Sequence, residues 1–329
     1  MVSKNTARNY IASGMTWGNE AKGTTTEEVL KNAGMDFEVG LEPIYTSTGR
    51  PIRSKFHRTF RTDTDFTLGV VTNKYHVMQN QHMLQIADGL IDTGEIEWDR
   101  IGMVENGVSV MASFKLPETH TIGDWGDAME QRIYLMQSHD GSGGLKVIPS
   151  MMRLICTNQA SAFAAQLTQA NIDLRALTIR HSSKMTERIG MLKNALRIQN
   201  QFANQFVHDA EQMLKVEMTQ DERIEFYIDT LNLTRVENAD AVDNDFGLKT
   251  RGMNTLNHLL ALENAPTNTV GDMFGTGWQA YNVLTEYIDH AWIHNADGTV
   301  NQGKAERALV GTGARIKNKA YNGIMQLTV

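Results

Sequence analysis

The chain has 329 residues, of which 41% are hydrophobic, and it carries a formal net charge of −7 and a single cysteine. This length and composition suit a globular protein of one large or two modest domains, and a single cysteine excludes a disulfide within the chain. No apolar stretch approaches the roughly 18 residues of a membrane span, and the start does not resemble a signal peptide. We therefore expect a cytoplasmic protein with no membrane contact.

The first half of the chain predicts strands. Residues 1–40 show little periodicity apart from a short helix before Val29, and we interpret them as a loosely structured N-terminal arm. A helix is expected over 80–91. Strands are expected over residues 66–71, 96–104, 108–116, 133–138 and 145–156. In the clearest one, 108–116, apolar residues alternate with Ser109, Met111, Ser113 and Lys115, which indicates a half-buried strand.

Two sequence features predict the fold class: short turns between strands, and a change from strand-like to helical spacing of the apolar residues later in the chain. Asn106-Gly107 and the glycine-rich stretch 141–144 are typical of tight turns between antiparallel strands. From residue 158 onward the apolar spacing becomes helical. We predict an α+β fold with an antiparallel sheet and short hairpins in the N-terminal half, flanked by helices, and a mainly helical C-terminal half. Residues 41–215 would form the α+β core with a basic helix, and 216–329 a helical region packed on it.

Charge is distributed unevenly along the sequence. Residues 50–61 hold five cations and no acid, interleaved with Phe56, His57 and Phe60, whereas 174–197 holds six cations and one acid. Residues 219–245 are acidic. Cations beside aromatic rings offer phosphate contacts and stacking surfaces for single strands. The alternatives are a strand with outward charges at 50–61, and a solvated cationic helix face paired with the acidic segment. The candidate nucleic-acid-binding residues are Arg53, Lys55, Arg58, Arg61, Lys74, Lys146, Arg153, Arg180, Lys184 and Arg188.

Several sequence patterns resemble catalytic or phosphate-binding motifs but lack the geometry or the residue spacing that the chemistry requires. Consecutive residues on a strand point to opposite faces, so Ser138, His139 and Asp140 cannot form a hydrolytic relay. Cys156 lies at the end of a predicted apolar strand, and we interpret it as a small buried hydrophobic residue. The Gly-Thr-Gly triplets at 275–277 and 311–313 do not match the sequence motif of a phosphate-binding loop, and we interpret them as helix caps or turns. We expect no nucleotide cofactor and no catalytic residues.

The stretch 275–290 allows two interpretations. On a helix, Asn282, Glu286, His290 and His294 share one face, with Asp289 beside them, which is compatible with a metal site. The opposite stripe has core spacing, which indicates an amphipathic helix whose polar face caps a neighbouring element. That stripe comprises Trp278, Tyr281, Thr285, Ile288 and Trp292. We favour the amphipathic helix and expect no metal.

Segments 71–80, 137–142, 153–158, 179–181 and 275–290 resemble, in this order, motifs of the phage/plasmid-like proteins that carry a domain of unknown function of the DUF nine-thirty-two type. The resemblance spans about residues 40 to 325 and implies a gene of phage or plasmid type. In its order of a helix, antiparallel strands and a further helix, the chain is more distantly similar to the RecT, Red-beta and Erf single-strand annealing proteins. This second likeness is an analogy of element order.

These observations favour a phage- or plasmid-type protein that binds single-stranded DNA and promotes ATP-independent annealing or recombination in the host cytoplasm, as a homo-oligomeric ring or filament. One alternative is a metal-dependent enzyme acting on nucleic acid through Glu286, Asp289 and His290. The other is a noncatalytic phage protein that contacts a host complex through the acidic segment 219–245. Added metal would separate the enzyme from the annealing protein, and salt-sensitive strand binding would separate both from the interaction protein.

Overall fold

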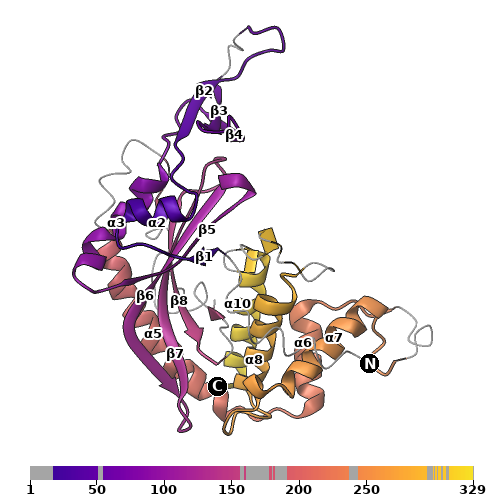
Figure 1. Ribbon diagram of the computed structural model, residues 1–329. Coiled ribbons are helices and arrows are strands. Elements are labelled where there is room, and N and C mark those ends of the chain that lie inside the picture. The colour runs from indigo at the N-terminus through magenta and orange to yellow at the C-terminus, as the bar shows by residue number, and fades with distance from the viewer. Residues whose placement is uncertain are drawn as a thin grey trace.

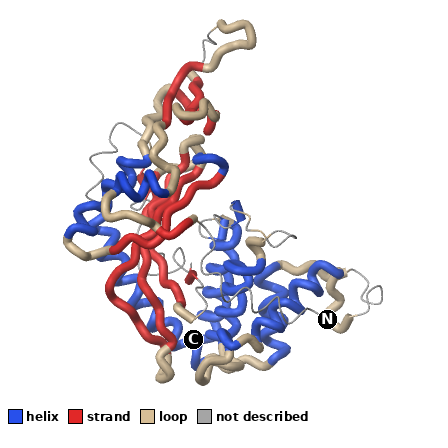
Figure 2. The backbone as a smooth tube through the Cα atoms, in the orientation of Figure 1, coloured by secondary structure: helices blue, strands red, loops and turns tan. Residues whose placement is uncertain are grey.

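The computed structural model describes residues 18–50, 55–155, 159–160, 178–179, 181, 191–236, 244–294, 299, 301, 303–304, 307–308 and 311–328. A long curved sheet stands beside a group of helices, and a small three-stranded sheet projects beyond one end of the large one (Figure 1). Strands dominate the N-terminal half of the chain and helices the C-terminal half (Figure 2). The predicted α+β class is confirmed.

The large sheet is antiparallel at every described pairing and has the order β1-β5-β6-β7-β8-β10, with β9 also paired to β8. Its strands are β1 (Asn19–Glu20), β5 (Glu97–Val104), β6 (Ser109–Ile122), β7 (Asp127–Ser138), β8 (Leu145–Arg153), β9 (Gln159–Ala160) and β10 (Thr178–Ile179). The predicted strands 96–104, 108–116, 133–138 and 145–156 correspond to β5 to β8, although β6 and β7 are longer than expected.

The predicted turn between β5 and β6 is confirmed and has a clear steric reason. A short 3-10 turn, η1 (Glu105–Gly107), joins the two strands. Asn106 has φ 57° and Gly107 has φ 105°, a region that asparagine and glycine tolerate better than other residues. A Cβ atom on Gly107 would lie 2.5 Å from the Phe37 ring, so glycine is also required by packing.

The small sheet consists of β2 (Val39–Pro43), β3 (Phe56–Arg61) and β4 (Thr67–Thr72), paired antiparallel in that order. The segment 50–61 therefore contains a strand, as in the alternative interpretation of this segment as a strand with outward charges. This sheet rests on the turn after β7: the Thr59 hydroxyl donates to the His139 carbonyl at 2.7 Å, and Gly69 lies so close to Asp140 that a Cβ there would clash with its backbone.

Two helices cover the upper part of the large sheet. They are α2 (Thr26–Asn32), whose N-cap Thr25 accepts a hydrogen bond from the Glu28 amide, and α3 (Asn80–Asp92). Both predicted helices are thereby confirmed. Together with alternate residues of β5 to β8 they bury one apolar cluster that includes Leu84, Phe114 and Ile133. The described part of the predicted N-terminal arm, β1 and α2, is thus attached to the core.

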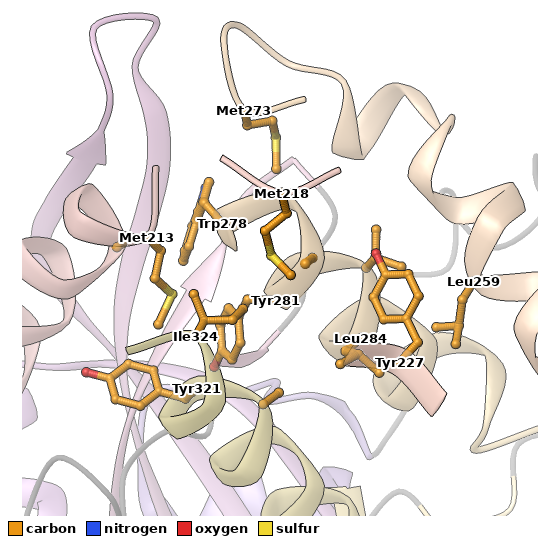
Figure 3. Close-up of a cluster of buried hydrophobic side chains, with 14 of the residues drawn as sticks. Met213, Met218, Tyr227, Leu259, Met273, Trp278, Tyr281, Leu284, Tyr321 and Ile324 are labelled. Atoms are coloured by element: carbon orange, nitrogen blue, oxygen red, sulfur yellow. The ribbon is translucent and has the colours of Figure 1, made fainter. Parts of the chain in front are cut away.

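The C-terminal half forms a second apolar cluster. Its elements are α5 (Met191–Lys215), α6 (Gln220–Leu231), α7 (Thr250–Glu263), the 3-10 turn η5 (Pro266–Asn268), α8 (Gly277–Glu286), the π-helical turn η6 (Tyr287–Ala291), α10 (Thr312–Met325) and the 3-10 turn η7 (Gln326–Thr328). Trp278, Tyr281 and Tyr321 pack at its centre (Figure 3). Phe202 and Phe206 of α5 join it to the lower end of the sheet through Met129 and Met151. None of the helices in the described residues is long and apolar enough for a membrane crossing.

Two expectations about burial are wrong. Strand β6 was expected to expose alternate side chains, but Met111 and Ser113 are buried. The reason is a polar network on the second face, in which the Ser113 hydroxyl donates to Asp99 at 2.6 Å and Arg132 pairs with the same carboxylate. Helix α8 was expected to be amphipathic, with a polar face that caps a neighbouring element; Glu286 on that face does contact η5, but every residue of the helix is buried. Within the helical region the Gln279 amide donates to the Glu263 and Asn268 carbonyls, and the partners of Glu286 are described below.

Candidate nucleic-acid interface

Arg58 is neutralised by two carboxylates that lie outside the basic segment. Its guanidinium lies on the outer face of β3, 2.7 Å from Glu42 of β2 and 2.5 Å from Asp65 in the following turn. It also lies over the Phe60 ring at 4.5 Å from the centroid. Sequence spacing could not show these acids, because β2 and the β3–β4 turn become neighbours only in the folded sheet. A phosphate would have to displace them to bind Arg58.

The Arg61 guanidinium also has partners within the fold. It pairs with Asp63 at 2.6 Å, donates to the Asn106 carbonyl at 3.1 Å and stacks over the Phe37 ring at 3.9 Å. These contacts tie the end of β3 to the β5–β6 turn. Arg58 and Arg61 therefore stabilise the small sheet, and the structure gives them less freedom to contact a strand than the sequence predicts.

Lys55 and Lys74 differ from these arginines because both are exposed. Neither ammonium group forms an ion pair with any residue that the structure describes. The two lysines lie close together, because the Asn73 amide donates to the Lys55 carbonyl at 2.7 Å, next to the Phe56–Thr72 pair of β3 and β4. Two of the predicted cations therefore gather at the end of the small sheet where β3 begins and β4 ends.

Tyr75 and His181 form a stacked pair next to these lysines. Their ring centroids are 4.8 Å apart with an interplanar angle of 25°. The Tyr75 hydroxyl donates to the Ser138 carbonyl at 3.2 Å, and the His181 ring donates from Nδ1 to the His76 carbonyl at 3.2 Å. Burial lowers the pKa of His181, so the ring is held neutral in this stack.

The second basic block reaches the same place. Strand β10, which lies inside the block 174–197, pairs with the start of β8 so that Thr178 faces Lys146 and Ile179 faces Leu145. Lys146 is half-buried, extends over Gly143 in the β7–β8 turn, and forms no ion pair within the described residues. The two basic segments, more than a hundred positions apart, therefore meet at one junction.

We call this surface the junction patch. It consists of Lys55, Phe56, Lys74, Tyr75, Lys146 and His181. The predicted site residues Arg53, Arg180, Lys184 and Arg188 lie outside the described residues.

A buried polar layer supports the patch from beneath. His139 is completely buried, and its Nε2 lies 3.0 Å from Oδ1 of Asn80. Asn80 donates through Nδ2 to the Met35 carbonyl, so its Oδ1 is an acceptor and His139 carries its proton on Nε2. Burial, with a smaller contribution from His181, lowers the pKa of His139 to about 4. A neutral His139 thus fixes the turn on which the patch rests.

The Ser138-His139-Asp140 sequence is not a relay, as predicted. The Ser138 hydroxyl donates to the Gly143 carbonyl at 3.2 Å, and accepts from the Ser142 hydroxyl at 3.1 Å. The His139 ring points instead toward Asn80. The three side chains therefore serve separate structural contacts.

Arg153 is a correction to the predicted binding set. Its Nε lies 2.9 and 2.7 Å from the two carboxylate oxygens of Asp127, and its Nη1 donates to the Thr267 carbonyl at 2.6 Å. The Trp278 indole donates to the same Asp127 carboxylate at 3.2 Å. The side chain is only 1% exposed, so a phosphate cannot reach it. Arg153 instead joins the large sheet to the helical region.

The residues of the alternative metal site have separate partners. The Glu286 carboxylate accepts hydrogen bonds from the Thr267 hydroxyl and from Nδ2 of Asn268, both at 2.9 Å. Asp289 pairs with the buried Lys317 at 2.5 Å. Among the described residues, no three His, Cys, Asp or Glu side chains are grouped so that they could hold a metal ion. Glu286 and Asp289 are therefore used in contacts within the helical region.

The acidic segment is partly used within the fold. Glu222 forms a capping box with Thr219 at the start of α6, and Glu225 pairs with Arg235 at 2.5 Å. Residues 237–243 lie outside the described part. Glu222 and Glu225 therefore have local structural roles, and the cations of 174–197 with which the segment was expected to pair lie outside the residues whose side chains the structure describes.

The fold is α+β, and the segments that carry the family resemblance lie in two groups: 71–80, 137–142 and His181 meet at the junction patch, and Arg153 meets Trp278 through Asp127. Four of them, 71–80, 137–142, 153–158 and 275–290, hold residues whose contacts are given above, and His181 belongs to the fifth. The chain belongs to the family described as the domain of unknown function (DUF932), whose family model matches residues 67–309. The searches of curated proteins and of solved structures found no match.

Sequence reasoning missed the Tyr75–His181 pair as a site. Both residues lie in segments that carry the family resemblance, so the signal was present. What the sequence could not supply was their contact, which depends on β10 pairing with β8.

Proposed function

We propose that the protein binds single-stranded DNA at the junction patch and promotes annealing of complementary strands without a nucleotide cofactor. The observation that carries the proposal is the convergence of the two basic segments: Lys55 and Lys74 lie where β3 begins and β4 ends, and Lys146 lies where β10 brings in the second segment. Cations without local carboxylate partners bind phosphates more readily than paired ones, because no ion pair must first be broken.

The chemistry of the patch suits a single strand. Phe56 is 43% exposed beside Lys55 and offers an apolar surface for a base or sugar. A protein with a net charge of −7 repels nucleic acid over most of its surface, so binding would be confined to the places where cations gather. A strand held by its backbone leaves base edges available for pairing, as annealing requires.

The small sheet also offers a surface for self-association, which the proposal includes. Its region holds five large apolar side chains that are at least 39% exposed: Leu41, Tyr45, Phe56, Phe66 and Val70. A concentration of exposed apolar side chains on a projecting element is typical of an interaction surface. A ring or filament in which this sheet contacts a neighbouring copy would place successive junction patches along one strand.

Fluorescence anisotropy with a labelled single-stranded oligonucleotide tests binding. We expect affinity to fall steeply with salt, and the Lys55→Glu, Lys74→Glu and Lys146→Glu triple variant to bind at least tenfold more weakly. Loss of three phosphate contacts would lower the slope of log affinity against log salt by about 2, since each contact on a single strand contributes roughly 0.7.

The matched control is Lys215→Glu, an exposed lysine at the end of α5 that should leave affinity unchanged. Annealing is measured by the rate at which two complementary oligonucleotides pair, with no ATP present. Salt-independent affinity, or equal loss in the triple variant and the control, would refute the proposal. Binding without faster annealing would restrict the function to strand protection.

A further inference from the structure

A cavity of about 390 Å³ lies in the helical region, away from the junction patch. It is bounded by the segment after α6, the start of α7, the π-helical turn η6 and α10. Among its lining residues are Leu233, Lys249, Arg251, Tyr287, Trp292 and Ile316. It shares no residue with the junction patch, and its volume is in the range of small-molecule sites.

The π-helical turn gives this cavity its aromatic wall. In an α-helix two residues five positions apart point in directions about 140° apart. In η6 the Trp292 amide donates to the Tyr287 carbonyl at 2.8 Å, five residues back, so the turn is wider and both rings line the same cavity. Helical spacing predicted Trp292 in the core, but it is half-buried. π-Turns inside helices are frequent at functional sites.

The Tyr287 ring is held in place by a neighbour. His258 of α7 contacts it edge-on, with centroids 5.5 Å apart and an interplanar angle of 77°. A ring that is fixed before a ligand arrives loses little conformational freedom on binding. The cavity therefore presents a prepared aromatic surface.

Two cations also line the cavity. Lys249 is the N-cap of α7 and Arg251 lies in its first turn; both are exposed, and neither forms an ion pair with a described residue. No carboxylate is among the described lining residues, although the protein is acidic overall. The positive end of the helix dipole adds to the two side-chain charges. The lining thus combines apolar and aromatic side chains with two cations.

We propose that this cavity binds a nucleotide unit, with the base against Trp292 and Tyr287 and the phosphate at Lys249 and Arg251. A flat aromatic group joined to an anion suits both kinds of lining side chain, the aromatic rings and the cations. Asn232, Thr234 and Thr255 add hydroxyl and amide groups along the lining that can bond to the base edge or the sugar. The ligand is either a free nucleotide or the terminal nucleotide of a strand, and the site does not depend on the junction patch.

Isothermal titration calorimetry on the full chain tests the assignment with AMP, adenosine and inorganic phosphate as probes. Lys249→Gln with Arg251→Gln should weaken AMP binding at least tenfold and leave adenosine unchanged. Trp292→Leu should weaken AMP and adenosine by a similar factor and leave phosphate unchanged. Arg315→Gln, on α10 but outside the lining, is the matched control, and should change nothing.

A 5′-phosphorylated oligonucleotide separates the two sources of the ligand. If the terminal unit of a strand is bound, the oligonucleotide binds at least tenfold more tightly than AMP, and both are weakened by the Lys249/Arg251 variant. If a free nucleotide is bound, AMP is the tighter ligand. Absence of AMP and oligonucleotide binding at millimolar concentration, or binding that the Lys249/Arg251 variant does not weaken, overturns the proposal. These two positions are exposed, so the variant should fold even if Trp292→Leu does not.

Discussion

The buried histidine beneath the junction patch makes the stability of the fold depend on pH. His139 donates from Nε2 to Asn80, and its Nδ1 has no hydrogen-bond partner within the described residues. A protonated ring would place a charge and an unsatisfied N–H in a buried site, which accounts for the fall of its pKa from 6.5 to about 4.

The sign and size of the effect follow from linkage. Between these two pKa values the unfolded chain binds a proton at His139 and the folded chain does not, so stability falls as pH falls. The pKa difference corresponds to about 3 kcal/mol in total, and about 2 kcal/mol of it is lost between pH 7 and pH 5. Burial also lowers the pKa values of His181 and His258, which adds to the loss in the same direction.

The test compares the wild type with His139→Gln by urea unfolding at pH 7 and pH 5. The glutamine amide can still donate to Asn80 but does not titrate. We expect the wild type to lose about 2 kcal/mol more than the variant over this interval. Carboxylates change little above pH 5, so they do not obscure the comparison. An equal loss of unfolding free energy in the two proteins would show that His139 is not held neutral as described.

Three further predictions concern the contacts that hold the molecule together. Arg153→Ala should lower the free energy of unfolding by about 3–5 kcal/mol, because it leaves Asp127 buried without its partner; urea unfolding measures this, and a loss below 1 kcal/mol would contradict it. Phe206→Ala should cost about 3–5 kcal/mol in the same assay through the cavity it leaves between α5 and Trp278, and a near-neutral result would mean that this contact is not packed as described. Arg58→Gln should weaken oligonucleotide binding less than Lys74→Gln in the anisotropy assay, because Arg58 is already paired with Glu42; the reverse order would restore the arginine to the interface.

Local patterns predicted the elements well. Alternation in 108–116 and the Asn106-Gly107 pair predicted β6 and the turn before it, because strand period and turn chemistry depend on neighbours in sequence. The same alternation gave the wrong burial, since the covering of the second face by Asp99 and Arg132 depends on residues of other strands. Element type could thus be predicted, but exposure could not.

The candidate site shows the same limit. Counting cations selected Arg58, Arg153 and Lys74 equally, yet only Lys74 is exposed and without an ion pair in the described structure. The carboxylates that neutralise the two arginines are brought close by strand pairing. Helical spacing likewise assigned Trp292 to the core, because it assumed an α-helix where the chain makes a π-turn. The sequence patterns did not contain two kinds of information: which carboxylates pair with the cations in the folded chain, and where the helix changes from α to π.

The hydrogen bond between Asp127 and Trp278 has a consequence for the order in which the chain can fold. The two residues are 151 positions apart, and the Arg153 bond to Thr267 spans 114. A ribosome needs roughly 8–30 s to make 151 residues at its usual rate. During that interval α5 is already made, but Thr267 and Trp278 are not, so the Asp127–Arg153 pair at the lower end of the sheet lacks their cover. Closure of the core must therefore await synthesis of the C-terminal third, and nascent chains that stop before α8 would expose this end to aggregation and proteolysis.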